Sequence, residues 1–156
     1  MESIKQILEE WAIDREKVLI DNYHKKGLKA SGNFERTLHH TTTENELNII
    51  GQLYTGALVL GRKQNTKQDT ESLRKWVGWA GSTFLKDWVQ DKGLSLNSYA
   101  VAWSIARKGI KVPNQHNDGR LLLDTFTKES VATLMGQISK NYITTIKSDI
   151  QESWLK

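Results

Sequence analysis

The sequence predicts an α+β fold in which a small antiparallel sheet packs against several helices, with a long helix near each end of the chain. Apolar residues recur at helical spacing near both termini and through the middle of the chain. Between them, residues 33–50 alternate apolar and polar side chains and are rich in Thr and Ile, as β-strands are. The single proline, Pro113, leaves nearly every other segment free to be helical.

Residues 3–26 are predicted to form the first helix. Ser3 is suited to its N-cap, and Gly27 is suited to its C-terminal stop. The basic pair Lys25-Lys26, just before that glycine, suits the negative end of the helix dipole.

Two strands are predicted within residues 33–50. The alternation begins at Phe34 and runs through His40, and a Thr-rich and Ile-rich stretch follows. The polar pair Glu44-Asn45 marks the expected turn, so the two strands should form a hairpin.

A short helix is predicted next, from Leu53 to Leu60, and Gly61-Arg62 closes it. Residues 63–71 then contain no apolar side chain, which predicts an exposed loop.

A Trp-bearing helix is predicted to end at Gly93; Ser72 is suited to its N-cap, and Asp69 or Thr70 would also serve. Gly78 and Gly81 lie inside it, where they bend or split the helix or let another helix approach closely. Residues 95–108 are predicted to form a further helix, and its small alanine side chains predict a close neighbour.

The C-terminal part is predicted to begin with a loop over residues 109–120. Residues 121–153 follow as one long amphipathic helix, because their apolar residues recur three and four positions apart. Asp124 or Thr127 is suited to start this helix.

The length of 156 residues fits one domain and suffices to bury a core without metals or disulfides. We therefore expect a single domain over residues 1–156. It divides into an N-terminal helix (1–27), a core (28–150) and a C-terminal tail (151–156).

The composition favours a protein without a membrane segment. The longest apolar run, Ala57–Leu60, is far too short to span a bilayer, and the N-terminus lacks the basic and apolar parts of a secretory signal. We expect use inside a cell or release by lysis. A net charge of +4 permits contact with nucleic acid without requiring it.

No catalytic residue, cofactor site or metal site is predicted, and an enzyme is not expected. The chain has no cysteine, which excludes disulfides, thiolate nucleophiles and cysteine zinc sites. His39-His40 is the densest pair of potential ligands, but neighbours on a strand point to opposite faces. The sequence has neither a Gly-x-Ser-x-Gly elbow nor a Walker-type phosphate loop.

The six tryptophans are numerous for a chain of this length. Trp76, Trp88 and Trp103 lie at core-like spacing, so we expect them to be mostly buried. Trp79 either caps a close helix contact or faces a partner. Trp154 either folds back or is buried in a neighbouring subunit.

Several short motifs occur in a characteristic order. They are Leu28-Lys29-Ala30-Ser31-Gly32 before the first strand, Tyr54 with Gly61-Arg62, Trp88 with Lys92-Gly93-Leu94, and the Ala-rich helix that ends in Ile105-Ala106-Arg107-Lys108. In this order they resemble the lambda-Z-like neck or tail-completion proteins of tailed bacteriophages. The resemblance covers about residues 28–150.

The resemblance implies a small sheet packed on helices and a non-enzymatic role at the head–tail junction. Such proteins form a ring on the portal or neck and help to join the tail to the head. Tail completion, neck adaptor and tail terminator all remain open, because this chain lacks a proline after Gly61-Arg62 and has a longer N-terminal helix. The expected location is the neck or tail region of the virion, after synthesis in the host cytoplasm.

The expected partners are copies of the chain itself in a ring, together with portal, neck adaptor or tail proteins. We expect a weak or absent oligomer in isolation and a closed ring in the particle. The residues predicted to contact partners are Trp11, Arg62, Lys63, Lys67, Trp79, Trp154 and Leu155. Those predicted to face a DNA channel loosely are Lys25, Lys26 and Lys29. The alternative function is that of a stand-alone basic helical nucleic-acid-binding protein.

Overall fold

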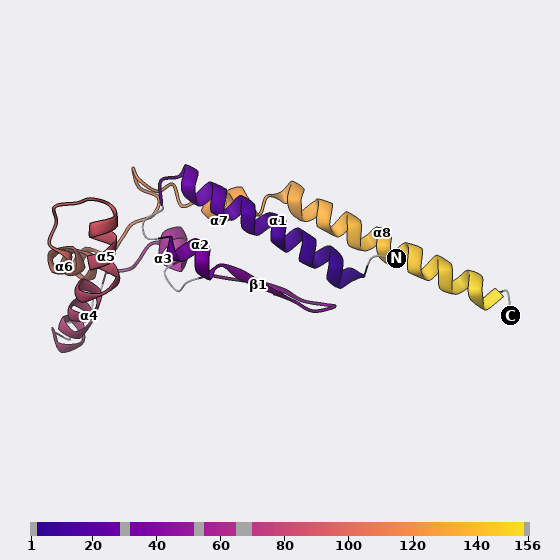
Figure 1. Ribbon diagram of the computed structural model, residues 1–156, viewed down its shortest axis with the longest axis horizontal. Helices are drawn as coiled ribbons and strands as arrows, with labels where there is room; N and C mark the ends of the chain where they lie inside the picture. Colours follow the sequence, from indigo (N-terminus) through magenta and orange to yellow (C-terminus); the bar gives the residue numbers. More distant parts are fainter. Residues whose placement is uncertain (1–2, 29–31, 52–54, 65–69, 155–156) are drawn as a thin grey trace.

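The computed structural model describes residues 3–28, 32–51, 55–64 and 70–154 and shows an elongated α+β molecule (Figure 1). Its elements in chain order are α1 (Ile4–Lys25), α2 (Asn33–Thr37), β1 (His39–Thr42), β2 (Leu47–Ile50), α3 (Thr55–Leu60), α4 (Thr70–Ser82), α5 (Phe84–Asp91), α6 (Ser98–Lys108), α7 (Leu121–Thr125) and α8 (Lys128–Trp154).

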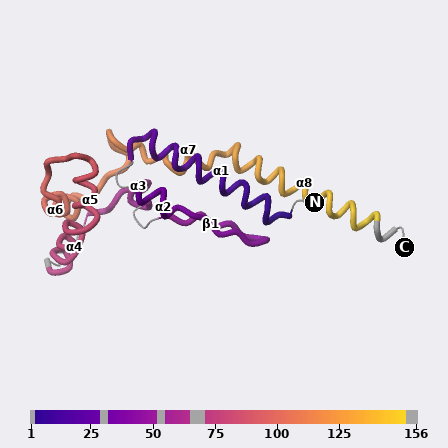
Figure 2. Tube along the Cα trace, viewed as in Figure 1, coloured from indigo at the N-terminus to yellow at the C-terminus, as the bar shows by residue number. Residues whose placement is uncertain are grey.

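The molecule has two parts, which the ribbon and the Cα trace show from the same side (Figures 1 and 2). Helices α4, α5 and α6 gather at one end, and we call them the lobe. The other described elements form the body, in which α1 contacts α7, α8 and both strands. The second half of α8 continues past the start of α1 and ends at the opposite end of the molecule from the lobe.

Both predicted caps of α1 are confirmed. The Ser3 hydroxyl accepts a hydrogen bond from the Gln6 amide at 3.2 Å, and the Gln6 side chain accepts one from the Ser3 amide at 2.7 Å. At the other end, Gly27 takes a φ of 65°, and the Leu28 amide reaches back to the Tyr23 carbonyl at 3.1 Å.

The predicted hairpin and the place of its turn are also confirmed. Strands β1 and β2 are antiparallel, with His39 opposite Ile50 and Thr42 opposite Leu47. Residues 43–46 form the turn between them. Because α1 contacts both strands, the hairpin lies along the body rather than projecting from it.

The strand predicted from Phe34 onward is wrong over its first part, where α2 forms instead. Gly32 at a φ of 75° turns the chain into this helix. The Phe34 ring is fully buried and stacks on Tyr23 with their centroids 4.3 Å apart. The burial of one aromatic side chain against α1 therefore outweighed the strand-like alternation.

The Trp-bearing helix is two helices, α4 and α5, separated at Thr83. Trp76, Trp88 and Trp103 are predicted to be mostly buried, and this prediction is wrong for Trp88, which is 37 % exposed. Trp76 and Trp103 are half-buried at the edge of the lobe's core. On α5, which begins after Thr83, Leu85 and Val89 are the buried residues in place of Trp88.

Small side chains bring α4 and α6 together, which confirms the close neighbour predicted from the alanines. Ala102 and Ala106 are buried in the lobe's core. A Cβ atom on Gly81 would lie 2.6 Å from the Tyr99 ring, so glycine is required there. The Tyr99 side chain, which packs on Gly81, is still 46 % exposed.

The single C-terminal helix predicted over residues 121–153 is also two helices, α7 and α8. The chain leaves helical geometry at Phe126. Thr127 then starts α8, as one of the two sequence alternatives proposed, and its hydroxyl accepts from the Ser130 amide at 3.2 Å. Leu121 and Thr125 of α7 are buried, and this short helix anchors the long one to α1.

Replacing Phe34 with Ala should reduce the free energy of unfolding by about 3–5 kcal/mol, because the change empties a fully buried aromatic site. Trp79→Ala is the matched control, since that ring is 58 % exposed, and it should change stability by less than about 1 kcal/mol. Urea unfolding followed by circular dichroism measures both. Equal losses in the two variants would mean that Phe34 is not a core residue.

Candidate assembly surfaces

The chain enters the lobe after α3 and returns from it after α6 through two short segments that pair with each other. Arg62 and Ile110 form an antiparallel bridge in which each amide donates to the other's carbonyl at 2.8 Å. Gly61 and Gly109 precede them with φ of 73° and 71°. A Cβ on either glycine would lie 2.2–2.3 Å from a carbonyl oxygen of the opposite segment. We call these four residues the joint.

Side chains near the joint tie the lobe further to the body. The Arg62 guanidinium carbon lies 3.7 Å from the centre of the Trp76 ring in α4, which is a cation–π contact. Burial lowers the pKa of Arg62, which stays charged near neutral pH. The Lys92 ammonium, at the end of α5, donates to the Gly27 carbonyl at 2.9 Å.

Lys26, one of the residues predicted to face a DNA channel, is paired within the chain. Its ammonium lies 2.7 Å from a carboxylate oxygen of Asp118 and 2.7 Å from one of Asp124. Hydrogen bonds from Lys26 lower the pKa of both carboxyl groups, and hydrogen bonds to Asp118 and Asp124 raise the pKa of Lys26. The cluster fastens the end of α1 to α7 and the segment before it.

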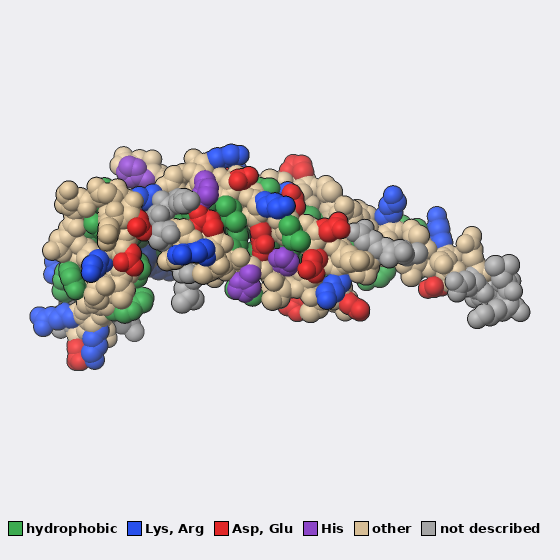
Figure 3. Space-filling view, viewed as in Figure 1, with side chains coloured by type: hydrophobic (Ala, Val, Ile, Leu, Met, Phe, Trp, Pro, Cys, Tyr) green, Lys and Arg blue, Asp and Glu red, His purple; other side chains and the backbone are tan. Residues whose placement is uncertain are grey.

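Lys25 and Lys63, predicted for the channel and for partner contact, are exposed. On the face shown in Figure 3, basic and acidic side chains are interspersed along the body rather than gathered by sign. Their predicted roles stay predictions.

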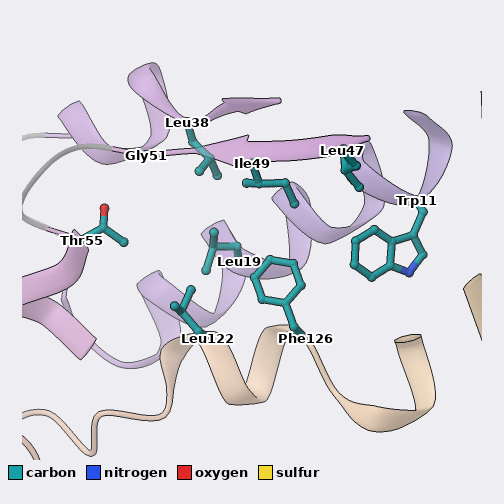
Figure 4. Close-up of a pocket in the computed structure, with 9 residues that line it drawn as sticks. All are labelled: Trp11, Leu19, Leu38, Leu47, Ile49, Gly51, Thr55, Leu122 and Phe126. Atoms are coloured by element: carbon teal, nitrogen blue, oxygen red, sulfur yellow. The ribbon is translucent and has the colours of Figure 1, made fainter. Parts of the chain in front are cut away.

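An apolar hollow of about 360 Å³ lies between the hairpin, α1 and α7 (Figure 4). It is lined mainly by Trp11, Leu19, Leu38, Leu47, Ile49, Leu122 and Phe126. Trp11 was predicted to contact a partner. Its indole N–H donates to the Ser130 carbonyl at 3.1 Å, and its ring lies 5.9 Å from that of Phe126, so the side chain joins α1 to the start of α8.

Three exposed aromatic side chains form a patch on the lobe, which we call the aromatic patch. Trp79 is 58 % exposed, Phe84 44 % and Trp88 37 %. The Trp79 and Phe84 rings are in tilted contact with centroids 5.3 Å apart. Phe84 and Trp88 are one helical turn apart on α5, so the three rings are neighbours. Trp79, predicted to cap a helix contact or to face a partner, is part of this patch and contacts Phe84.

A second apolar surface lies on the far half of α8, and we call it the distal face. Tyr142, Ile143, Ile146 and Ile150 are each half-exposed, between 50 % and 55 %. At helical spacing these four positions fall within an arc of about 100°. Neither periodicity nor composition separated this face from the buried stretch of the same helix, where Leu134 and Ile138 pack near Ile7 and Leu8 of α1.

Other predicted contact residues fall outside what the structure describes. Lys29, Lys67 and Leu155 lie outside the described residues. Trp154 is the last residue of α8, but its side chain is also outside the description. The roles predicted for these residues stay predictions.

The histidines do not converge. The His39 Nδ1 atom lies 2.9 Å from the Thr37 carbonyl oxygen, and the His40 Nδ1 atom lies 3.0 Å from the Glu16 carboxylate on α1. Within the described residues, no group of three or more His, Asp or Glu side chains is placed to hold a metal ion.

Among the described helices, none combines the length and apolar character needed to cross a membrane.

Comparison with known proteins returned nothing that names a family: no family model, curated protein or solved structure matches the chain.

The joint predicts a large cost for a side chain at Gly109. Gly109→Ala should lower the free energy of unfolding by at least about 2 kcal/mol, because it adds left-handed backbone strain and a clash with the Arg62 carbonyl. Gly78→Ala is the control. That glycine lies inside α4 with no atom within 4 Å of an added Cβ, so the change should stabilise by about 0.5–1 kcal/mol. Thermal and urea unfolding measure both, and similar effects of the two variants would contradict the joint.

The Lys26 cluster predicts a specific pH dependence. The lowered pKa of Asp118 and Asp124 gives stability that is present above their usual value of 3.8 and lost as the pH falls through the lowered pKa. The raised pKa of Lys26 gives stability that is present below its usual value of 10.5 and lost as the pH rises through the raised pKa.

Lys26→Met should therefore be less stable than the wild type at neutral pH, and the difference should shrink in strong acid and strong alkali. Lys25→Met changes an exposed neighbour and should follow the wild-type profile. Urea unfolding across the pH range measures the difference. If the difference in the free energy of unfolding between Lys26→Met and the wild type does not change with pH, the ion pairs of Lys26 with Asp118 and Asp124 do not stabilise the fold.

Proposed function

We propose that this chain is a structural virion protein of a tailed phage, which forms a ring at the neck or head–tail junction and helps to join or complete the tail. The observation that carries the proposal is the pair of exposed apolar surfaces, the aromatic patch and the distal face of α8, at opposite ends of an elongated molecule.

A closed ring requires each subunit to present two different surfaces, one to each neighbour. It also requires a fixed angle between those surfaces, because a variable angle gives open chains. The joint supports this requirement, since paired backbone segments and two left-handed glycines connect the lobe to the body. A Cβ at either glycine would strike the opposite segment, so the pairing tolerates little rearrangement.

The residues that resemble the phage family build these same features. Gly61-Arg62 belongs to the joint. Lys92-Gly93 closes α5, with the Lys92 side chain tied to the body. The Ile105 carbonyl accepts a hydrogen bond from the Gly109 amide at 2.8 Å, so the end of α6 leads directly into the joint. The proposal therefore treats these motifs as the framework of an assembly subunit, and it assigns no catalytic residue.

The partners in this proposal are copies of the chain and the portal, neck adaptor or tail proteins beside it. Packaged DNA passes through the ring, so contact with it is loose and depends on salt. Pairing of Lys26 with two carboxylates favours this over a dedicated phosphate-binding surface.

Electron microscopy of the full chain tests the proposal, first alone and then together with the portal and neck proteins of the phage that the proposal implies. The chain alone should be mostly monomeric, because the exposed surfaces are small. Together with its partners it should appear as a closed ring of copies. A reconstructed particle that holds a single copy touching no like subunit would contradict the proposal.

Filter binding of duplex DNA by the monomer distinguishes the proposed ring protein from the alternative, a stand-alone nucleic-acid-binding protein. Weak binding that disappears between low and moderate salt and shows no sequence preference agrees with the ring. Tight, sequence-selective binding that survives moderate salt would favour the stand-alone nucleic-acid-binding protein instead.

A further inference from the structure

The aromatic patch of the lobe carries negative charge at its edge. Asp87 and Asp91 are exposed on α5, three residues after Phe84 and Trp88 respectively, and therefore lie on the same side of the helix as those rings. Lys86 points to the other side of α5. On its α5 side the patch is thus bordered by two carboxylates. On its α4 side Lys75 lies one turn before Trp79, and its ammonium is paired with Glu71 at 2.9 Å.

The distal face of α8 carries positive charge at its edge. Lys140 and Lys147 are exposed, three residues before and four residues after Ile143, so they border the isoleucines along one side. Asp149 lies at the opposite edge, next to Tyr142. The isoleucine side of this face is therefore apolar with a basic border.

We infer that the ring contact joins the distal face of α8 in one copy to the aromatic patch of the lobe in the next copy. This inference rests on the proposed ring function and names the two surfaces that meet. Aromatic rings pack on the isoleucines, and Asp87 and Asp91 face Lys140 and Lys147 across the contact. Such charge complementarity fixes the register of two surfaces and disfavours the pairing of like surfaces.

The two surfaces cannot meet within one molecule. Helix α8 has 27 residues and is therefore about 40 Å long, and its far half points away from the lobe (Figure 1). The same separation makes the contact heterologous: each copy offers its patch to one neighbour and its distal face to the other. Repetition of such a contact at a fixed angle generates a ring when the rotation closes, and the proposed ring function requires that it does.

The size of the contact explains why assembly needs a template. The three aromatic side chains are roughly half exposed, and complete burial of such a side chain removes about 150–250 Å² from water, so together they supply on the order of 300 Å². A stable interface buries about 800 Å² on each partner. One such contact is therefore weak by itself, and a ring on a template gains stability from many contacts closed together.

Cysteine cross-linking tests the contact directly, because the chain has no native cysteine. One preparation carries Thr83→Cys, beside the aromatic patch, and the other carries Ser139→Cys, which lies one turn before the isoleucines on the same side of α8. The two are mixed under assembly conditions with a short thiol cross-linker, and a size tag distinguishes the products. Thr144→Cys, exposed on the opposite side of α8, replaces Ser139→Cys as the control.

The Thr83–Ser139 product should exceed the Thr83–Thr144 product several-fold. Reversing the acidic border with Asp87→Lys and Asp91→Lys in the Thr83→Cys protein should reduce that product several-fold. Adding Lys140→Glu and Lys147→Glu to the Ser139→Cys protein should then restore it. The cross-linked product is restored only if the two surfaces meet. Damage to the fold by either pair of substitutions would not be reversed by the other pair.

Two outcomes overturn the inference. If rings are visible by electron microscopy but the Thr83–Ser139 product does not exceed the control, the ring proposal stands and this contact is wrong. If Ser139→Cys chains cross-link chiefly to one another, α8 pairs with itself instead. The absence of rings in the presence of portal and neck proteins would count against the proposed function itself.

Discussion

The chain leaves the body and returns to it within one short stretch of paired backbone, and the position of the whole lobe depends on that pairing. Arg62 and Ile110 exchange two hydrogen bonds at 2.8 Å, and Gly61 and Gly109 let the two segments approach so closely that neither position has room for a Cβ. The Arg62 side chain then covers Trp76, which extends the same contact into α4. The aromatic patch and the distal face of α8 consequently have a defined position relative to each other.

Much of the fold follows from local patterns that the sequence displays. Ser3, Gly27 and the hairpin turn act through neighbouring backbone groups, so their residue types are enough to predict them. The errors occur where a distant contact decides. Phe34 lies in a short helix with its ring buried on Tyr23, and on α5, after the break at Thr83, Val89 is buried and Trp88 is exposed. Neither feature can be predicted from the residues next to it in the sequence.

The candidate surfaces were less predictable than the fold. Trp79, for which the sequence predicts a helix contact or a partner, is the most exposed aromatic side chain of the patch. The distal face of α8 was missed, because its isoleucines continue the same helical stripe that is buried further back against α1. The face is exposed because α8 continues past the start of α1, and this depends on how the two helices pack in the tertiary structure. The sequence predicts only that Gly109 starts a loop, because the segment that it pairs with in the joint lies far away in the sequence.

The central claim is that the joint holds the lobe in one position relative to the body in the free chain. Double electron–electron resonance between two spin labels tests this most directly. The labels are attached at Ser104→Cys on α6 and Glu10→Cys on α1, which are both exposed, and the chain has no native cysteine. A single narrow distribution of the distance between the two labels is expected. A broad or multiple distribution would show that the lobe moves on the body, and a subunit of that kind could not fix the angle that a closed ring requires.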